Sequence, residues 1–354
     1  MALRDAAAID KNFSTPKTVQ KDGLTYYNAN DLSVHGVQLI DEIYRRMPYD
    51  QAKKISDAVA MISSECAGGR IRFVTDSPYI AIFAKYRSVS KVPNYSYTAT
   101  LGFDLYSQER YIGCFVPAMD TMDCFESVLD VDNGSADNSG ARVYTLNFPI
   151  CSEVSELYIG VKQGSILDKA PDYAIKNPIV FYGSSTTQGA CASRPGNTYE
   201  NILSRKLDCN YLNLGFWGNA VGEAEMANYI AGLEMSAFVY DYDYNAPSAE
   251  HLAATHEKMF QIIRERQPNL PIVILSAPKF YLNETDEQRR AIIENTYQNA
   301  VRRGDTRVRF IAGSTMLESV KDTALADNIH PGDSGFVCIA EHVHEALQDL
   351  FRQN

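Results

Sequence analysis

The fold of this chain is decided by one stretch, Asn177-Pro178-Ile179-Val180-Phe181-Tyr182-Gly183-Ser184-Ser185-Thr186-Thr187-Gln188-Gly189-Ala190. Its short apolar run, bounded by a proline, predicts a fully buried strand. The strand ends at a glycine and a cluster of hydroxyl side chains, and a helical segment follows over residues 198–207. Open α/β sheets bind ligands beyond the carboxyl ends of their strands. The turn after this strand is therefore a candidate reactive site, and Ser185 is our candidate nucleophile.

A turn rich in glycine, serine and threonine can instead bind phosphate through its backbone N–H groups. A phosphate-binding loop needs a lysine after its last glycine, but Ala190 follows Gly189, and the dinucleotide-binding fingerprint is also absent. The turn differs from the Gly-x-Ser-x-Gly nucleophile elbow as well, because Thr187 occupies the position of the second glycine. This stretch alone leaves catalysis and phosphate binding open.

Size and composition exclude several classes of partner. The 354 residues are enough for two domains, and contents of 45% hydrophobic and 22% charged residues are ordinary for a globular protein. The net charge of −11 argues against a nucleic-acid surface and against anionic membranes. No apolar run approaches the roughly 20 residues that a membrane-spanning helix needs. We therefore expect neither nucleic acid nor a membrane as a partner.

The seven cysteines are scattered, without a C-x-x-C pair or the spacing of a zinc site. We expect no metal and no cofactor. Cys191, six residues after Ser185, is a rival nucleophile in principle, although a small buried core residue is the simpler interpretation. Residues 1–13 contain four charged side chains and no apolar segment, so the sequence as given predicts a cytoplasmic protein. A periplasmic or secreted protein is expected if a signal peptide was removed.

The first half of the chain predicts an antiparallel β structure. Residues 70–75 alternate polar and apolar side chains with a period of two, as a half-buried strand does. Six more segments repeat this pattern, at 79–84, 96–105, 111–116, 126–131, 143–148 and 157–161. Turn clusters such as Asp132-Asn133-Gly134-Ser135 separate them, which predicts a jelly-roll-like β-sandwich. A helical pattern within residues 31–65, clearest at 37–44, predicts a partly helical leader.

A polar, proline-containing linker between Asp168 and Asn177 marks a boundary, so we predict domains at residues 1–172 and 173–354. Strands and helices alternate beyond it. The predicted strands are 179–182, 211–214, 237–242, 272–275 and 308–311. The predicted helices are 198–207, 223–234, 248–266, 284–303 and 335–352, the last with Asp333 and Ser334 as capping residues. This alternation predicts an α/β fold, a five-stranded, doubly wound parallel sheet with helices on both faces.

Three loops at the predicted carboxyl edge of this sheet carry polar residues and glycines. They are Asn213-Leu214-Gly215-Phe216-Trp217-Gly218-Asn219, Asp241-Tyr242-Asp243-Tyr244-Asn245 and Asp327-Asn328-Ile329-His330. The glycines of the first can simply permit a tight turn, and Asn245 can form an Asx turn. Asp241 and Asp243 suggest a glycosidase pair, but pairing of one carboxylate with a lysine or arginine explains them equally well.

As a set, these loops resemble the sequence blocks of the SGNH (GDSL-type) hydrolases. That family has a Gly-Asp-Ser-x-Thr-x-x-Gly first block, an Asn-x-Gly-x-x-Gly second block, a Gly-x-Asn-Asp third block and an Asp-x-x-His last block. Residues 183–189 match the first, with Ser184 in the place of aspartate, and residues 213–218 and 327–330 match the second and the last. The third block departs most, because Asn245 lacks both the preceding glycine and the following aspartate.

The resemblance covers residues 178–354 and implies a flavodoxin-like SGNH fold. The first half resembles the small β-rich domain that precedes some of these hydrolases and carries a Gly-x-Asp-Leu-Tyr signature, which Gly102-Phe103-Asp104-Leu105-Tyr106 reproduces. This second match is shorter, but it agrees with the strand pattern that the residues show independently.

The resemblance implies acyl transfer through Ser185. A serine hydroxyl is a poor nucleophile until a base takes its proton. His330 is the implied base, and Asp327 is implied to orient its ring. The implied oxyanion hole consists of the backbone N–H groups of Ser185 and Gly218 and the side chain of Asn245.

We therefore expect a serine ester hydrolase that removes a short acyl group, with acetyl as the leading candidate, from a carbohydrate or another small ester. The expected partner is that small-molecule or carbohydrate ester. An acyltransferase would use the same triad and pass the acyl group to an alcohol. A catalytically silent carbohydrate-binding protein is the other alternative, because Ser184 and the third block deviate from the family pattern.

Overall fold

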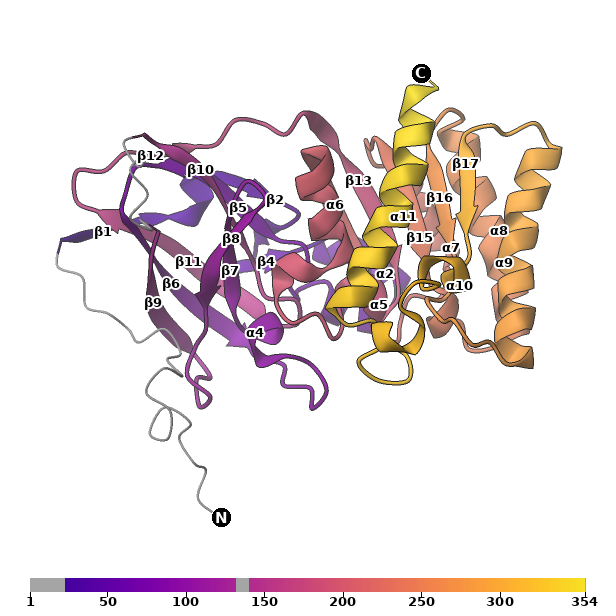
Figure 1. The fold of residues 1–354 in the computed structure, drawn as a ribbon, viewed down its shortest axis with the longest axis horizontal. Helices are drawn as coiled ribbons and strands as arrows, with labels where there is room; N and C mark the ends of the chain where they lie inside the picture. Colours follow the sequence, from indigo (N-terminus) through magenta and orange to yellow (C-terminus); the bar gives the residue numbers. More distant parts are fainter. Residues whose placement is uncertain (1–22, 132–139, 354) are drawn as a thin grey trace, which may run out of the picture.

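The computed structural model describes residues 23–131 and 140–353, and the two halves of the chain are built differently (Figure 1). The first half consists mainly of antiparallel strands, and the second half is a parallel sheet covered by helices. The predicted turn at 132–135 and the first 22 residues of the predicted leader lie outside the described residues.

Two antiparallel sheets form the first half. One has the order β1-β11-β6-β9, which are Leu24–Asn28, Glu153–Lys162, Tyr79–Ser88 and Cys124–Asp130. The other has the order β12-β5-β10-β7-β8, with β2 also paired to β5; in that order the strands are Leu167–Lys169, Arg70–Thr75, Arg142–Asn147, Phe103–Ser107 and Arg110–Phe115, and β2 is Ser33–His35. Apolar side chains from both sheets, such as Phe73, Ile82, Leu105 and Ile159, form one buried cluster. The predicted β-sandwich is confirmed.

The leader differs from the prediction at residues 37–44. A helical pattern suggested a helix there, but the segment forms a hairpin of β3 (Gln38–Ile40) and β4 (Ile43–Arg45). Asp41 and Glu42 form its two-residue loop with φ values of 50° and 61°, as a type I′ turn requires. The prediction is wrong because apolar side chains three to four residues apart also occur in two short strands joined by a tight turn. The helices of the leader come later, as α2 (Tyr49–Ile55) and α3 (Asp57–Ile62).

A second difference lies at residues 96–105. The predicted strand is shorter than expected, because a single helical turn, α4 (Tyr97–Thr100), precedes β7. The loop between β6 and α4 leads toward the second half of the molecule, where Ser96 donates a hydrogen bond to the backbone carbonyl of Ser193 at 2.8 Å.

The second half contains five parallel strands in the order β14-β13-β15-β16-β17, which are Cys209–Gly215, Ile175–Gly183, Ala237–Asp241, Ile272–Leu275 and Val308–Ile311. The predicted doubly wound sheet is confirmed. In this strand order the winding direction reverses beside β13, so a crevice is expected between the carboxyl ends of β13 and β15. The first and third sequence blocks follow these two strands directly.

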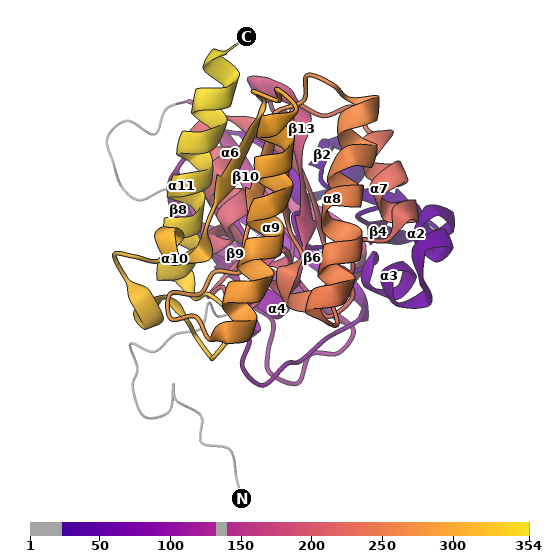
Figure 2. The same ribbon diagram turned by 90° about the vertical axis from the view of Figure 1, so that its right-hand side faces the viewer.

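Helices cover both faces of the sheet (Figure 2). One face is covered by α6 (Tyr199–Leu207) and α11 (Asp333–Arg352), and the other by α7 (Ala224–Ala231), α8 (Ala249–Arg266) and α9 (Glu284–Arg302). The final helix begins two residues earlier than predicted, with Gly332 as its N-cap. None of the helices within residues 23–131 and 140–353 combines the length and the hydropathy needed to cross a lipid bilayer.

The edge strand β14 lies against the first half, where two buried arginines bind it. Arg70 donates from Nη2 to the backbone carbonyl of Tyr211 at 3.1 Å and to Oδ1 of Asn210 at 2.9 Å. Arg46 donates from Nη1 to the carbonyl of Gly215 at 2.5 Å, at the other end of the strand. Both arginines are at most 3% exposed, so these bonds hold the two halves together away from water.

Candidate active site

The loop after β13 places Ser185 at the start of a short helix, α5 (Ser185–Gln188). Ser184 is the N-cap: its hydroxyl accepts the backbone N–H of Thr186 at 3.2 Å and donates to Asp241 at 3.5 Å. This is how a serine takes the place that aspartate has in the family pattern. The N–H of Ser185, as the first residue of the helix, has no partner within the helix and can bind an external acceptor.

The structure brings the three predicted triad residues together. Ser185 Oγ lies 2.8 Å from His330 Nε2, and His330 Nδ1 lies 2.8 Å from Asp327 Oδ2. The side chains of His330 and Asp327 are 15% and 28% exposed, and Ser185 is 8% exposed, so the group can be reached from solvent. The arrangement allows the imidazole to accept the serine proton while the carboxylate holds its other nitrogen.

A tight loop holds Asp327 in this position. Its Oδ1 accepts the backbone N–H groups of Ile329 and His330, each at 2.7 Å. Partial burial by itself would raise the pKa of Asp327, but the hydrogen bonds from the side chain and backbone of His330 and from Ile329 hold this pKa well below its usual range. Asp327 is therefore ionised at neutral pH and stabilises a protonated imidazole.

The second block forms a turn beside Ser185. Asn219 donates its backbone N–H to the carbonyl of Phe216 at 2.8 Å, and Gly218 lies at the third position of this turn with φ +70°. A type II turn needs positive φ there, which explains the glycine. A Cβ at 218 would meet no atom within 4 Å, so the space beside this glycine is open. Crowding occurs at Gly215, where a Cβ would lie 2.3 Å from the backbone nitrogen of Gln188.

Asn245 joins the third block to this turn. It ends a short 3-10 helix, η3 (Asp243–Asn245), and its Nδ2 donates to the carbonyl of Phe216 at 2.9 Å. A side-chain amide carries two N–H donors, so one of them remains available for a ligand. The three predicted oxyanion donors thus lie on α5, on the adjoining turn and on a residue bonded to that turn.

The remaining acidic residues near the site have other partners. Asp241 is buried under α5, where it accepts hydrogen bonds from Ser184 and Thr187, and burial raises its pKa to about 8. Asp243 pairs with Arg289 at 2.8 Å. Asp243 is therefore explained by its ion pair with an arginine, which was the alternative to a glycosidase pair.

Sequence patterns gave no indication of three further residues, which come from the first half of the chain. Asn94 Nδ2 donates to Asp327 Oδ2 at 2.6 Å, and the Tyr95 ring lies edge-on to the His330 ring with 5.8 Å between centroids. Glu65 accepts Gln188 Nε2 at 2.5 Å and Trp217 Nε1 at 2.9 Å. Asn94 and Tyr95 lie in an aperiodic loop and Glu65 follows a helix, so no spacing linked them to the blocks.

The Gly-x-Asp-Leu-Tyr signature of the first half docks against a loop of the second half. Asp104 is fully buried, and its Oδ2 accepts the backbone N–H of Gly196 at 2.7 Å. Tyr106 accepts a hydrogen bond from Arg194 Nε at 3.2 Å. The signature therefore contributes to the interface between the two halves, close to the segment that follows Ser185.

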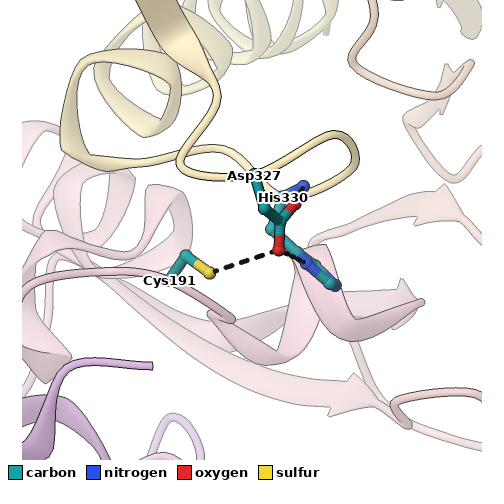
Figure 3. A group of neighbouring side chains, drawn as sticks. All are labelled: Cys191, Asp327 and His330. Carbon is teal, nitrogen blue, oxygen red and sulfur yellow. Dashed lines mark hydrogen bonds and ion pairs between the residues drawn. The ribbon is translucent and has the colours of Figure 1, made fainter. Parts of the chain in front are cut away.

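Cys191 lies beside Asp327 and His330 (Figure 3). Its Sγ is 4.0 Å from Asp327 Oδ2 and donates to the carbonyl of Asn94 at 3.4 Å. The Cys191 sulfur, an Asp327 carboxylate oxygen and a His330 ring nitrogen lie within 4.8 Å of one another. Among the described residues, these three side chains form the group whose spacing would allow a metal ion. Burial, followed by the nearby Asp327 charge, raises the pKa of Cys191 to about 12, so it is a neutral thiol and a poor nucleophile. It is only half-buried, which corrects its interpretation as a core residue.

A separate hollow of about 450 Å³ lies between the halves near the amino end of β14. Arg70, Arg72 and Arg205 line it together with Tyr106 and Tyr173, and none of its lining residues is a histidine or a cysteine. Two of its guanidinium groups stack on tyrosine rings, at 3.9 Å for Arg72 on Tyr173 and at 4.1 Å for Arg205 on Tyr106.

Comparison with protein families agrees with both halves of the chain. Residues 176–348 match the GDSL-like Lipase/Acylhydrolase family, and residues 24–167 match the GxDLY family, described as the N-terminus of SGNH-hydro-type esterases. The second half belongs to the GDSL-like lipase/acylhydrolase family, and the chain is an esterase of the SGNH type with a GxDLY domain before it. A search of curated proteins found no match.

Solved structures share the arrangement of both halves. A protein described as a GDSL-like lipase from Bacteroides ovatus is 26% identical with a TM-score of 0.82, over 93% of this chain and 98% of that chain. The salicylyl-acyltransferase SsfX3 from a tetracycline biosynthetic pathway is 19% identical with a TM-score of 0.73, over 94% and 98%. A family two carbohydrate esterase from Clostridium thermocellum, solved with cellohexaose, is 13% identical with a TM-score of 0.63, over 92% and 98%. The latter two likenesses are likenesses of fold.

Proposed function

We propose that this protein is a serine ester hydrolase that removes a short acyl group, acetyl in the first place, from a carbohydrate or another small ester through an acyl-enzyme on Ser185. One observation carries the proposal. A continuous chain of two 2.8 Å hydrogen bonds links the Ser185 hydroxyl through His330 to the Asp327 carboxylate at a solvent-accessible edge.

In the first half-reaction, His330 Nε2 takes the proton of Ser185 Oγ while that oxygen attacks the ester carbonyl. The tetrahedral intermediate collapses, the bond to the alcohol oxygen breaks, and His330 returns its proton to that oxygen. In the second, His330 takes a proton from water, the hydroxide attacks the acyl-enzyme, and the carboxylic acid leaves as Ser185 regains its proton. Asp327 keeps the ring in the required tautomer and stabilises its positive charge throughout.

The negative charge on the carbonyl oxygen is met by the N–H groups of Ser185 and Gly218 and by the free amide hydrogen of Asn245. The positive φ of Gly218 and the bond from Asn245 to the turn support this role, because both keep the donors in place before substrate arrives. Each such donor typically contributes about 3 kcal/mol to stabilising the transition state.

Two observations support a carbohydrate ester as the substrate. Trp217, next to Gly218, is 42% exposed, and such an indole face beside the reacting carbonyl suits stacking on a sugar ring. Proteins that share the two-part fold include the cellohexaose-bound carbohydrate esterase and an acetyl xylan esterase from Butyrivibrio proteoclasticus, 12% identical with a TM-score of 0.60. The likeness to the salicylyl-acyltransferase supports a second candidate function, in which an alcohol replaces water in the second half-reaction.

The test uses a fluorophosphonate probe and p-nitrophenyl acetate with wild type and Ser185→Ala. Wild type is expected to be labelled and to release nitrophenol, and the variant to do neither. Equal labelling of both proteins would move the nucleophile to another residue. An unlabelled wild type would favour the silent carbohydrate-binding protein. Product analysis with an acetylated oligosaccharide, with and without a second alcohol, then separates hydrolysis from transfer.

A further inference from the structure

The loop between β6 and α4, residues 89–96, brings the first half of the chain to the triad. Asn94 donates from Nδ2 to Asp327 Oδ2 at 2.6 Å, across 233 positions of sequence. The loop is held on both sides of this contact. The Cys191 thiol donates to the Asn94 carbonyl at 3.4 Å, and the Ser96 hydroxyl donates to the Ser193 carbonyl at 2.8 Å.

We propose that Asn94 is a positioning residue of the triad, through which the β-domain sets the orientation and the basicity of the Asp327–His330 pair. The inference rests on the proposed function, because it assigns Asn94 a role in the same proton transfer. Asn94 would act through Asp327 and without contact to the reacting atoms.

Within the described residues, Asp327 accepts hydrogen bonds on both of its carboxylate oxygens. Its Oδ1 accepts two backbone N–H groups from its own loop, from Ile329 and His330. Its Oδ2 accepts His330 Nδ1 at 2.8 Å and the Asn94 amide at 2.6 Å. Three of these donors belong to the loop that carries Asp327 itself, so the amide of Asn94 is the contact that ties the carboxylate to the other domain.

A neutral donor on the same oxygen has two physical effects. It fixes the carboxylate plane, so that Oδ2 stays directed at the imidazole. It also withdraws part of the negative charge of that oxygen, which lowers the stabilisation that the carboxylate gives to a protonated His330. A carboxylate at position 94 has nearly the same shape but lies against the Asp327 carboxylate, so repulsion between like charges raises the pKa of one of the two and they share a proton at acidic pH. Once that proton is lost, the second negative charge favours the imidazolium, which is the opposite of the effect of the amide.

Three other titratable groups near the pair do not interfere with a pH measurement. Tyr95, Tyr244 and Cys191 face Asp327 or His330, and burial raises the pKa of each above the neutral range, to about 12 for Cys191. Burial raises the pKa of Glu65 to about 7, within the range of the measurement. Ser90 of the same loop donates to Glu65 at 3.5 Å, so each protein is also measured in a Glu65→Gln background, where a difference that remains between variants at position 94 reports on the pair.

The experiment compares Asn94→Asp and Asn94→Ala with wild type, and Ser96→Ala is the matched control because it removes a bond between the halves from the same loop without touching Asp327. The kcat and KM for p-nitrophenyl acetate and the rate of fluorophosphonate labelling are measured from about pH 5 to 9, with thermal unfolding of each protein.

Asn94→Asp is expected to move the acidic limb of both pH profiles upward by about one unit, since an added negative charge stabilises the imidazolium. Asn94→Ala is expected to lower kcat about tenfold with little change in KM, because the base is less well placed. Ser96→Ala is expected to keep the wild-type profile.

Four results would overturn the inference: an unshifted profile in Asn94→Asp, unchanged kcat in Asn94→Ala, the same shift in Ser96→Ala, or a higher KM at constant kcat, which would make Asn94 a substrate contact. Each of these requires a wild type that the probe labels. A wild type without labelling would contradict the proposed function instead, so the two failures are distinguishable. Asn94→Asp is nearly isosteric, so it tests the proposal even if Asn94→Ala unfolds.

Discussion

Two arginines of the first half bind opposite ends of the same strand, β14, and they differ in what lies beyond the strand. Arg70 holds the amino end, and its guanidinium carbon lies 3.6 Å from the centre of the Tyr211 ring. Arg46 holds the carboxyl end through the carbonyl of Gly215, and it also donates from Nε to the carbonyl of Glu65 at 2.8 Å. Both cations are buried, and both bind backbone carbonyls.

The consequences differ because only one end of the strand leads into the site. Gly215 is followed directly by the turn that carries Gly218, and Glu65 binds the Trp217 indole within that turn. Around Arg70 the partners are Gly68, Tyr173 and residues of β14, which lie at the other end of the sheet. The same type of contact thus supports stability at one end of β14, and both stability and the geometry of the site at the other.

Loss of the His330 imidazole, at the carboxyl end of the sheet, is expected to change turnover far more than stability. His330→Ala is expected to lower kcat/KM about 10⁴-fold, because Ser185 then lacks its base. The thermal unfolding midpoint is expected to stay near that of wild type, since the His330 side chain is partly exposed. Steady-state kinetics and calorimetry on the same preparation measure both quantities. A variant with near wild-type turnover would show that another base serves Ser185.

The next effect tests the two arginines directly. Arg70→Ala is expected to lower the free energy of unfolding by about 3–5 kcal/mol, because several buried acceptors lose their donor. The turnover of its folded molecules is expected to be unchanged. Arg46→Ala is expected to lose similar stability and also to turn over about tenfold more slowly, since the Gly218 turn is released. Urea unfolding and active-site titration separate the two quantities; equal losses of turnover in both variants would remove the distinction between the two ends.

A smaller effect concerns the third sequence block. Asn245→Ala is expected to lower kcat by about 10²-fold, because one oxyanion donor is lost and the Phe216 carbonyl loses a partner. KM for p-nitrophenyl acetate is expected to change little. Asn245→Asp serves as the control that keeps the size of the side chain without the donor, and it is expected to be as slow. Turnover within twofold of wild type in either variant would mean that Asn245 only supports the turn.

The smallest effect concerns Glu65. Burial raises the pKa of this carboxyl group to about 7, and Arg46, Trp217 and Gln188 oppose the shift more weakly. A raised pKa means that the folded protein opposes ionisation. The stability that the protonated carboxyl supports is complete below the unfolded pKa of about 4.5 and is lost as the pH rises through 7. As the pH rises from 4.5 to 8, the free energy of unfolding of Glu65→Gln is therefore expected to increase relative to that of wild type, by on the order of 1–3 kcal/mol.

Urea unfolding at several pH values measures this difference. The control is Glu156→Gln, on the same domain. The Glu156 side chain is 44% exposed, so this substitution is expected to leave the pH dependence of stability unchanged. Parallel curves for wild type and Glu65→Gln would show that the buried carboxyl is solvated well enough to ionise normally, and that its bonds to Gln188 and Trp217 do not depend on protonation.

Much of this arrangement was predictable because the second half obeys local rules. Buried parallel strands are continuous apolar runs, and their loops must gather at one edge, so Ser185, Asp327 and His330 could be expected to meet. The triad and oxyanion roles of these residues stay predictions until kinetics test them. The first half was harder. The pattern at 37–44 fits a helix or a hairpin equally, and the positive φ values of Asp41 and Glu42 decide between them.

The contacts of Asn94, Tyr95 and Glu65 could not be predicted for a different reason. They arise from how two domains pack, and packing between domains leaves no periodicity in the sequence of either. The signature around Asp104 did indicate a domain type, but its role in binding the backbone of Gly196 is visible only once both halves are in place.

The amide of Asn94 on the carboxylate of Asp327 has a consequence for protein engineering. A hydrolase half expressed alone, or grafted onto the β-domain of a relative, would keep its nucleophile and base but lose the outer restraint on its acid. Exchange between relatives should therefore be made with the 89–96 loop and the 327–330 loop as a single unit, and chimaeras that split this pair should show impaired turnover even when they fold.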